Sequence, residues 1–182
     1  MIWWLGYVAL LGILIVRVQS AESVPRPPLR PEPDEPLWLV KAHHVLFYAI
    51  LLGAPLEALV RAGVQRGRLG GLALFASGVA LYRLAGHALG EALSPLVTPR
   101  LGASLVTHGP YRRLRHPMYL GQALIAVGAP LTLGCRVVPW LALPAIVVLV
   151  VRAMVEDAAL ARTYPEHAHW SARTKRLFPF VF

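Results

Sequence analysis

The sequence predicts an all-α integral membrane protein with about five transmembrane helices. Three observations predict this fold class. Hydrophobic residues make up 57% of the 182-residue chain and charged residues only 15%, whereas soluble domains average about 45–50% and about 25%. The apolar residues form long runs between charged or Pro/Gly-rich segments. The net charge of +9 comes from basic residues in these short segments, where they usually report membrane orientation rather than nucleic-acid binding.

Five apolar runs are the expected spans, namely residues 1–16, 37–59, 69–84, 118–133 and 137–155. A span needs about 20 apolar residues, so we expect the first, third and fourth to recruit neighbouring residues or to be covered by protein. The short "GCR" linker predicts a tight antiparallel hairpin of the last two spans. The first run lacks the basic segment of a secretory signal, so we expect it to be retained as a span.

The segment between the first two runs, residues 17–36, contains six prolines and four acidic residues and predicts an extended loop. We therefore divide the chain into an N-terminal two-span region, residues 1–68, and a core with an amphipathic C-terminal tail, residues 69–182. Small residues spaced along "GGLALFASGVALYRLAG" predict close helix packing in the third span. The single cysteine, Cys135, excludes an intramolecular disulfide.

The distribution of basic residues predicts the orientation. One side of the membrane receives thirteen of them: Arg17, Arg26, Arg30, Lys41, Arg100, Arg112, Arg113, Arg115, Arg152, Arg162, Arg173, Lys175 and Arg176. The other side receives Arg61, Arg66, Arg68 and Arg136, and Arg83 lies in the third run. By the positive-inside rule the N-terminus lies outside and the C-terminal tail lies in the cytoplasm.

The stretch "LVTHGPYRRLRHPMYLG", residues 105–121, is the first candidate for chemistry. Gly109-Pro110 predicts a turn, and Pro117 is suited to the first turn of the next helix, whose free amides receive anionic groups. Tyr111 and Tyr119 offer aromatic faces to a ligand cation, and His116 adds a hydrogen-bonding group. The stretch suits a ligand that carries an anion, a cation and a flat ring; the alternative is a basic cytoplasmic loop.

Two further features follow. Arg152 and Glu156 share one helical face, either as a simple intrahelical salt bridge or as functional charges at membrane depth. The tail alternates aromatic and basic residues, so it lies at the membrane surface or folds back as a lid over a site. His167 and His169 lack a third ligand, so no metal site is expected. His43 and His44 are interpreted as polar residues at the membrane interface.

At these residues the sequence resembles the isoprenylcysteine carboxyl methyltransferase family, integral membrane enzymes that use S-adenosylmethionine. The family pattern LVT-x-G-x-Y followed by RHP-x-Y-x-G appears here as "LVTHGPY" and "RHPMYLG". Its later pattern appears as Arg152, Glu156-Asp157 and Leu160, and "RTKRLFP" resembles its closing basic stretch. The resemblance covers residues 69–182 by motif, which marks them as the methyltransferase core, and the first two spans by topology.

The resemblance implies roles for individual residues. It places S-adenosylmethionine against Ser104, Leu105, Val106, Tyr111, His116, Pro117, Met118, Tyr119 and Glu156, and it assigns the carboxylate of the methyl acceptor to Arg152 as the catalytic residue. The cofactor pocket is then cytoplasmic, built from the loop before the fourth span, the end of the fifth span and the tail. Ala103 stands where eukaryotic relatives have a histidine.

The resulting hypothesis is a methyltransferase of the bacterial inner membrane, with its active site at the cytoplasmic side. Its expected partners are membrane lipids and a lipophilic acceptor, with no nucleic acid. A carboxylate acceptor is favoured because Arg152 repels a protonated amine. Two alternatives stay open: an N-methyltransferase acting on a phospholipid or another amine, and a non-catalytic scaffold or sensor of the same fold.

Overall fold

The computed structural model describes residues 2–22, 28, 36–61 and 69–177. Within these ranges the regular elements are helices. Five are long: α1 (Ile2–Glu22), α2 (Leu37–Val60), α3 (Leu69–Leu89), α4 (Pro117–Thr132) and α5 (Ala142–Thr163). The short ones are η1 (Gly90–Ala92), η2 (Gly109–Arg112), η3 (Val138–Leu141) and α6 (His167–Ser171). The expected Pro-rich loop lies mostly outside the described residues, and its first six residues, 17–22, continue α1 instead.

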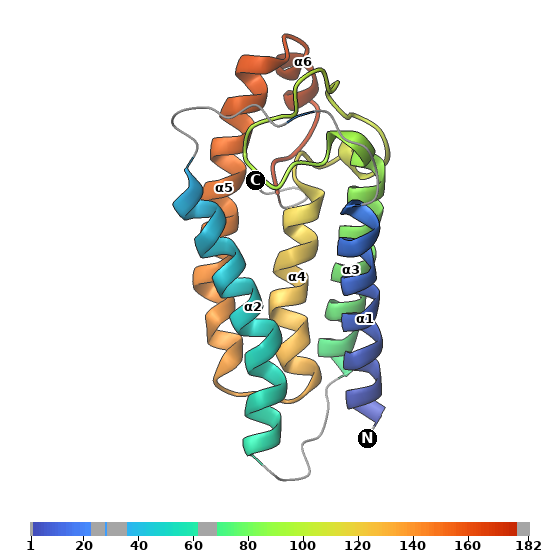
Figure 1. Ribbon diagram of the computed structural model, residues 1–182, viewed down its shortest axis with the longest axis vertical. Coiled ribbons are helices and arrows are strands. Elements are labelled where there is room, and N and C mark those ends of the chain that lie inside the picture. The colour runs from blue at the N-terminus through green and yellow to red at the C-terminus, as the bar shows by residue number, and fades with distance from the viewer. Residues whose placement is uncertain (1, 23–27, 29–35, 62–68, 178–182) are drawn as a thin grey trace.

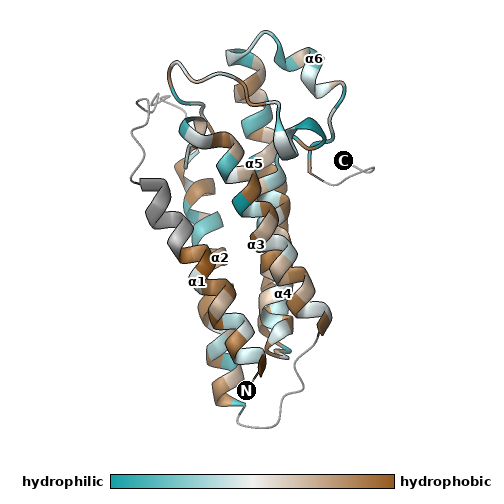
Figure 2. Cartoon of the chain, turned by 90° about the vertical axis from the view of Figure 1, so that its right-hand side faces the viewer, coloured by the Kyte–Doolittle hydropathy of each residue, from teal (hydrophilic) through white to brown (hydrophobic). Residues whose placement is uncertain are grey.

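The five long helices run along the long axis of the molecule (Figure 1). Helix α3 packs against α1 and α4, and α2 packs against α4 and α5, so that α4 contacts all the other long helices. The loop at residues 93–116 and α6 lie together at one end, opposite the N-terminus (Figure 1). Apolar residues dominate the helices, and hydrophilic residues gather toward the end that carries α6 (Figure 2).

Among the residues that the structure describes, three helices are long and apolar enough to cross a membrane: Leu37–Val60, Leu69–Ala92 and Val138–Thr163. Residues 2–15 form a shorter apolar helix. Large apolar side chains stand on the outer faces of these helices, such as Trp38 and Leu52, which are 66% and 67% exposed. Such faces are typical of contact with lipid. The predicted class, an all-α membrane protein, is confirmed.

Helices α3 and α4 approach each other over glycines. A Cβ on Gly78 would stand 2.7 Å from the carbonyl oxygen of Gly121, and one on Gly71 would stand 2.6 Å from the backbone of Thr132. Gly128 has equally close backbone neighbours in α3. Real Cβ atoms do not come this close to backbone atoms, so only glycine permits this separation, as in other small-residue membrane interfaces.

The predicted hairpin between the last two spans is present. It turns at Gly134, whose φ of 71° favours glycine. The Glu57 carboxylate at the end of α2 accepts backbone N–H groups of Arg136, Val137 and Val138 at 2.7–3.2 Å. It therefore satisfies free amides at the start of η3, which leads into α5.

At the opposite end of the molecule the tail folds back onto the loop before α4. Lys175 exchanges backbone hydrogen bonds with this loop, donating to Arg113 and accepting from Arg115, at 3.0 and 2.7 Å. The Leu177 side chain is fully buried and Trp170 is 8% exposed. The described part of the tail therefore folds back over the loop before α4.

Candidate functional site

A cavity of about 770 Å³ lies at the α6 end of the helices, and its walls come from α1, α2, α3, η1, the loop at residues 93–106, η2, α4, α5 and α6. Nine of the ten residues expected at the site line it: Ser104, Leu105, Val106, Tyr111, His116, Met118, Tyr119, Arg152 and Glu156. Pro117 does not line the cavity. It is buried as the first residue of α4, where its missing N–H costs no helical hydrogen bond.

Tyr119 stands at the centre of the polar part of the cavity. Its hydroxyl donates a hydrogen bond to the Glu156 carboxylate. The His116 ring stacks on the Tyr119 ring, with centroids 5.5 Å apart and planes 9° apart, and His116 Nδ1 lies 3.8 Å from Glu156 Oε1. The start of α4 thus presents two aromatic rings, and α5 a carboxylate, to one space.

Arg152 reaches the same ring from the adjoining turn of α5. Its guanidinium lies over Tyr119, 5.5 Å from the centroid, and donates a hydrogen bond to the Pro95 carbonyl. The residue is 4% exposed, and it forms no ion pair with a carboxylate of the described residues, so the intrahelical bridge to Glu156, one of the two alternatives for this pair, is absent. Within the part of the chain that the structure describes, Arg152 is therefore a buried cation at the cavity wall with no ion-paired carboxylate.

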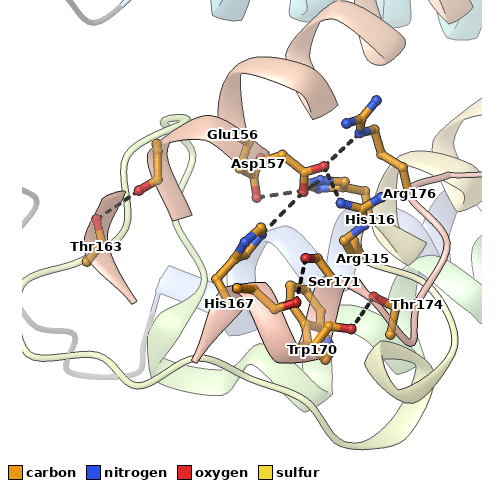
Figure 3. Close-up of polar contacts among 12 residues, drawn as sticks. Arg115, His116, Glu156, Asp157, Thr163, His167, Trp170, Ser171, Thr174 and Arg176 are labelled. Carbon is orange, nitrogen blue, oxygen red and sulfur yellow. Dashed lines mark hydrogen bonds and ion pairs between the residues drawn. The ribbon is translucent and has the colours of Figure 1, made fainter. Parts of the chain in front are cut away.

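Asp157 has a different role from its neighbour Glu156, because it faces the tail and the start of α4 rather than the cavity (Figure 3). Its carboxylate lies 2.9 Å from Arg115, 2.9 Å from His116 Nε2 and 2.7 Å from Arg176 Nε. His167 Nε2 lies 3.8 Å away. Asp157 is 5% exposed, so it joins three chain segments at a largely buried point.

An aromatic cluster closes the loop side of the cavity. Tyr111 of η2 and Trp170 of α6 pack with Ala85, and the Trp170 indole donates to the Tyr111 carbonyl at 2.9 Å. Burial, aided by the Glu156 carboxylate, raises the pKa of the Tyr111 phenol well above its usual value, so the phenol stays neutral. Burial also lowers the pKa of His167 against the opposing effect of Asp157.

The opposite part of the cavity is apolar. It is lined by Leu11 and Leu14 of α1 and by Phe47, Leu51 and Leu52 of α2. Leu52 is also 67% exposed. The lining thus has a polar half around Tyr119, Glu156 and Arg152 and an apolar half on α1 and α2.

Sequence reasoning missed two polar residues of the cavity, His43 of α2 and Gln122 of α4. The interpretation of His43 as an interface residue is not supported, because it is 6% exposed and its Nε2 lies 3.2 Å from Gln122 Nε2. The signal was a histidine and an amide within apolar runs, where polar groups are expensive unless they have a use. Trp170, Tyr164 and Arg115 also line the cavity.

The residues present fit S-adenosylmethionine. Glu156 is a carboxylate for an ammonium or ribose hydroxyls, the stacked Tyr119 and His116 rings offer faces to a sulfonium, and the cluster around Tyr111 and Trp170 is a flat apolar surface for a base. No group of three or more metal-ligating side chains occurs in the described part of the chain.

Comparison with known proteins agrees with this geometry. The sequence model of a family described as phospholipid methyltransferase matches residues 67–167, which include the whole stretch from Leu105 to Gly121 and the acidic pair of α5. The chain is also 34% identical over 84 residues to the cobalt-zinc-cadmium resistance protein CzcN of Cupriavidus metallidurans. That alignment covers 46% of this chain and 39% of CzcN, so the chain matches about two fifths of that relative's length.

Proposed function

The chain belongs to the phospholipid methyltransferase family, and on this premise we propose that it transfers a methyl group from S-adenosylmethionine to the carboxylate of a lipophilic acceptor. The family membership makes it a membrane methyltransferase, as the motifs predicted. The acceptor class, the cofactor and the roles of single residues are our proposal. In it, residues 69–182 form the methyltransferase core, and residues 1–68 complete the wall on the acceptor side.

The observation that carries the proposal is the state of Arg152. Arg152 is 4% exposed, and its guanidinium contacts the Tyr119 ring and the Pro95 carbonyl but forms no ion pair with a carboxylate of the described residues. A buried charge of this kind needs a counter-ion. An ionised carboxylate with two oxygens matches the planar guanidinium in a bidentate arrangement, and a cation there repels a protonated amine.

In this proposal Glu156 binds the cofactor and Arg152 orients the acceptor. S-adenosylmethionine, when bound, supplies the methyl group on a sulfonium that leaves as a neutral thioether. Glu156, fixed by the Tyr119 hydroxyl, holds the polar groups of the cofactor. Arg152 would hold the carboxylate of the acceptor through both oxygens and orient it toward the methyl group that the cofactor supplies. The carboxylate is already ionised at neutral pH, so this reaction depends on positioning more than on acid–base catalysis.

The shape of the cavity supports a lipophilic acceptor. Its apolar half, lined by α1 and α2, accepts a hydrocarbon chain from the membrane, while its polar half opens among the loop and the tail. In our proposal the acceptor enters from lipid and the cofactor from the cytoplasm of a bacterial inner membrane. This arrangement keeps a water-soluble cofactor and an insoluble acceptor on opposite sides of the reacting atoms.

One observation favours a second candidate, the N-methylation of a phospholipid amine. Arg152 binds a phosphate as readily as a carboxylate, and the matched family is described by phospholipid methylation. The amine then reacts in its unprotonated form. Supplying phosphatidylethanolamine and long-chain carboxylic acids in parallel separates the two candidates by the product that carries the methyl label.

The test of the division of labour uses purified protein in nanodiscs. We expect Glu156→Ala to weaken S-adenosylmethionine binding at least about tenfold, because a hydrogen bond to a charged group contributes roughly 1.5–3 kcal/mol. Arg152→Ala and Arg152→Lys should bind the cofactor normally and lose methyl transfer. Calorimetry measures the first effect and transfer of labelled methyl the second.

Exposed Glu91, which does not line the cavity, provides the control, since Glu91→Gln removes a carboxylate outside the site and should change neither quantity. Equal loss of cofactor binding in the Arg152 and Glu156 variants contradicts the proposed roles. A folded protein that binds no S-adenosylmethionine at all supports the scaffold alternative instead.

A further inference from the structure

Three side chains around Tyr119 carry buried polar atoms that lack a hydrogen-bond partner in the described part of the chain. They are Nδ1 of His43, Oε1 of Gln122 and Nε of Arg152. All three side chains are more than nine-tenths buried, with exposed fractions of 6%, 9% and 4%, and all three line the cavity. The His43 ring lies 6.3 Å from the Tyr119 ring, and Arg152 lies over that ring.

The contact between His43 and Gln122 makes the two residues one hydrogen-bonding unit. Their Nε2 atoms are 3.2 Å apart. In this orientation of the amide, its N–H donates to His43 Nε2. The proton of the neutral ring then lies on Nδ1, and the amide oxygen is left free. With the amide turned over, the ring donates instead, and Nδ1 becomes a free acceptor beside a free amide N–H. In both arrangements the pair offers one free donor and one free acceptor.

Buried polar atoms are nearly always paired in folded proteins, so three unpaired ones at one wall indicate a ligand. The anion-binding member is Arg152, which the proposed function already uses. The His43–Gln122 pair adds a free hydrogen-bond acceptor. A carboxylate cannot satisfy this acceptor, because the acceptor needs a donor N–H or O–H from the ligand. The ligand must therefore carry a hydrogen-bond donor close to its anionic group.

We propose that His43 and Gln122 determine acceptor specificity by binding an O–H group on the carbon next to the carboxylate that Arg152 holds. This inference rests on the proposed function for the position of the carboxylate. It names the acceptor class as a lipophilic acid with a 2-hydroxyl group. Arg152 holds the anion, the pair reads the neighbouring donor, and the apolar half of the cavity takes the chain.

The two members of the pair come from different parts of the sequence. Gln122 lies within the stretch that the family model matches, residues 67–167, whereas His43 lies before it in α2. Acceptor choice is thus set partly by the N-terminal two-span region, which also supplies the apolar wall. A methyltransferase core can change its acceptor by changing this region while its cofactor residues stay constant.

The experiment compares palmitate with 2-hydroxypalmitate, two acids that differ by one hydroxyl. Binding of each acid is measured on the full chain in nanodiscs with S-adenosylhomocysteine present, so that no turnover is needed. We expect the hydroxy acid to bind at least about tenfold more tightly to the unaltered chain, the effect of one well-placed hydrogen bond. In His43→Phe and Gln122→Met, which keep side-chain size, the ratio should fall to about one.

The matched control is His44→Phe, the same substitution one residue along α2. His44 is exposed and its Nδ1 already bonds to the Val40 carbonyl oxygen at 2.7 Å, so the tenfold ratio should persist. Affinity for S-adenosylhomocysteine, measured on each variant, establishes that the cofactor half of the site is intact. His43→Phe lies on α2 and Gln122→Met on α4. If one of them fails to fold, the other variant and the affinity ratio of the two acids in the unaltered chain still test the proposal.

The outcomes separate the two proposals. Equal binding of both acids by the unaltered chain, absence of binding by either acid, or a ratio that survives in both variants overturns the role of the pair. Methyl transfer from S-adenosylmethionine to the same acids is measured alongside. If the hydroxy acid binds preferentially but neither acid is methylated, ester formation is contradicted and the role of the pair stands. If the acids are methylated but bind equally, ester formation stands and the role of the pair is contradicted.

Discussion

Glu156 and Asp157 are neighbours in the sequence and do different work in the structure. Successive residues of an α-helix point about 100° apart, so Glu156 faces the cavity and Tyr119 while Asp157 faces the tail. The resemblance assigned Glu156 to the cofactor, but it gave Asp157 no role. Its role depends on the positions of Arg115 and Arg176, which approach from segments far away in the sequence.

The residue-scale prediction concerns Asp157. Asp157→Asn removes the anion that Arg115, His116 and Arg176 share, and breaking a buried ion pair in this way costs about 3 kcal/mol or more. The undocked tail should then be populated about 100-fold more often, and cleavage after its basic residues follows that population. Limited trypsin digestion, with mass analysis of the released C-terminal peptides, measures the effect.

The control for this prediction is Glu91→Gln, which removes an exposed carboxylate of η1 and should leave the cleavage rate unchanged. A tail that resists trypsin equally in the Asp157 variant would show that backbone pairing with the loop before α4 holds it unaided. In that case Asp157 matters for the charge balance at the start of α4 and not for docking.

At the scale of elements, the packing of α3 on α4 depends on four glycines at helix-contact positions: Gly71, Gly78, Gly121 and Gly128. Small residues at this spacing were visible in the sequence of the third run. Their partners in α4 were not, because periodicity shows that a face is narrow without showing which helix lies against it. The close approach fixes α4, and α4 in turn carries Tyr119 and Gln122 to the cavity.

We predict that Gly78→Ala destabilises the protein by about 1–3 kcal/mol, the usual cost of overpacking a tight interface. Its new methyl group meets the Gly121 carbonyl and the Ile125 backbone, which cannot move independently of α4. Thermal unfolding in detergent, followed by circular dichroism, measures the change. Gly70→Ala is the matched control in the same helix.

A Cβ on Gly70 meets nothing within 4 Å. Alanine there should be neutral or should raise stability by up to about 1 kcal/mol, because glycine is the weaker helix former. Equal melting temperatures for the two variants would mean that α3 and α4 separate at little cost. The position of Tyr119 would then not depend on this interface.

At the scale of the whole molecule, the five long helices could be predicted because each contains a run of apolar residues that must be buried or face lipid. Helices α1, α3 and α5 continue past the ends of their apolar runs at residues 16, 84 and 155. The first and third runs were expected to recruit neighbouring residues; the extension of α5 was not, and it occurs because charged residues end an apolar run without ending a helix. The pair of His43 and Gln122, 79 residues apart, could not be predicted, because a polar residue in an apolar run does not reveal what faces it.

The final prediction concerns orientation, which decides whether the polar half of the cavity meets the cofactor. Basic residues concentrate at the end that carries the loop and tail, so the positive-inside rule places that end in the cytoplasm. In a Cys135→Ala background, Val137→Cys should react with a membrane-impermeant maleimide in intact cells, because Val137 lies at the opposite end and is 66% exposed. His169→Cys, on the exposed side of α6, should react only after the membrane is permeabilised. The reverse labelling pattern would open the polar half of the cavity to the outside, away from the cytoplasmic supply of S-adenosylmethionine, and would contradict the proposed reaction even if the isolated protein binds the cofactor.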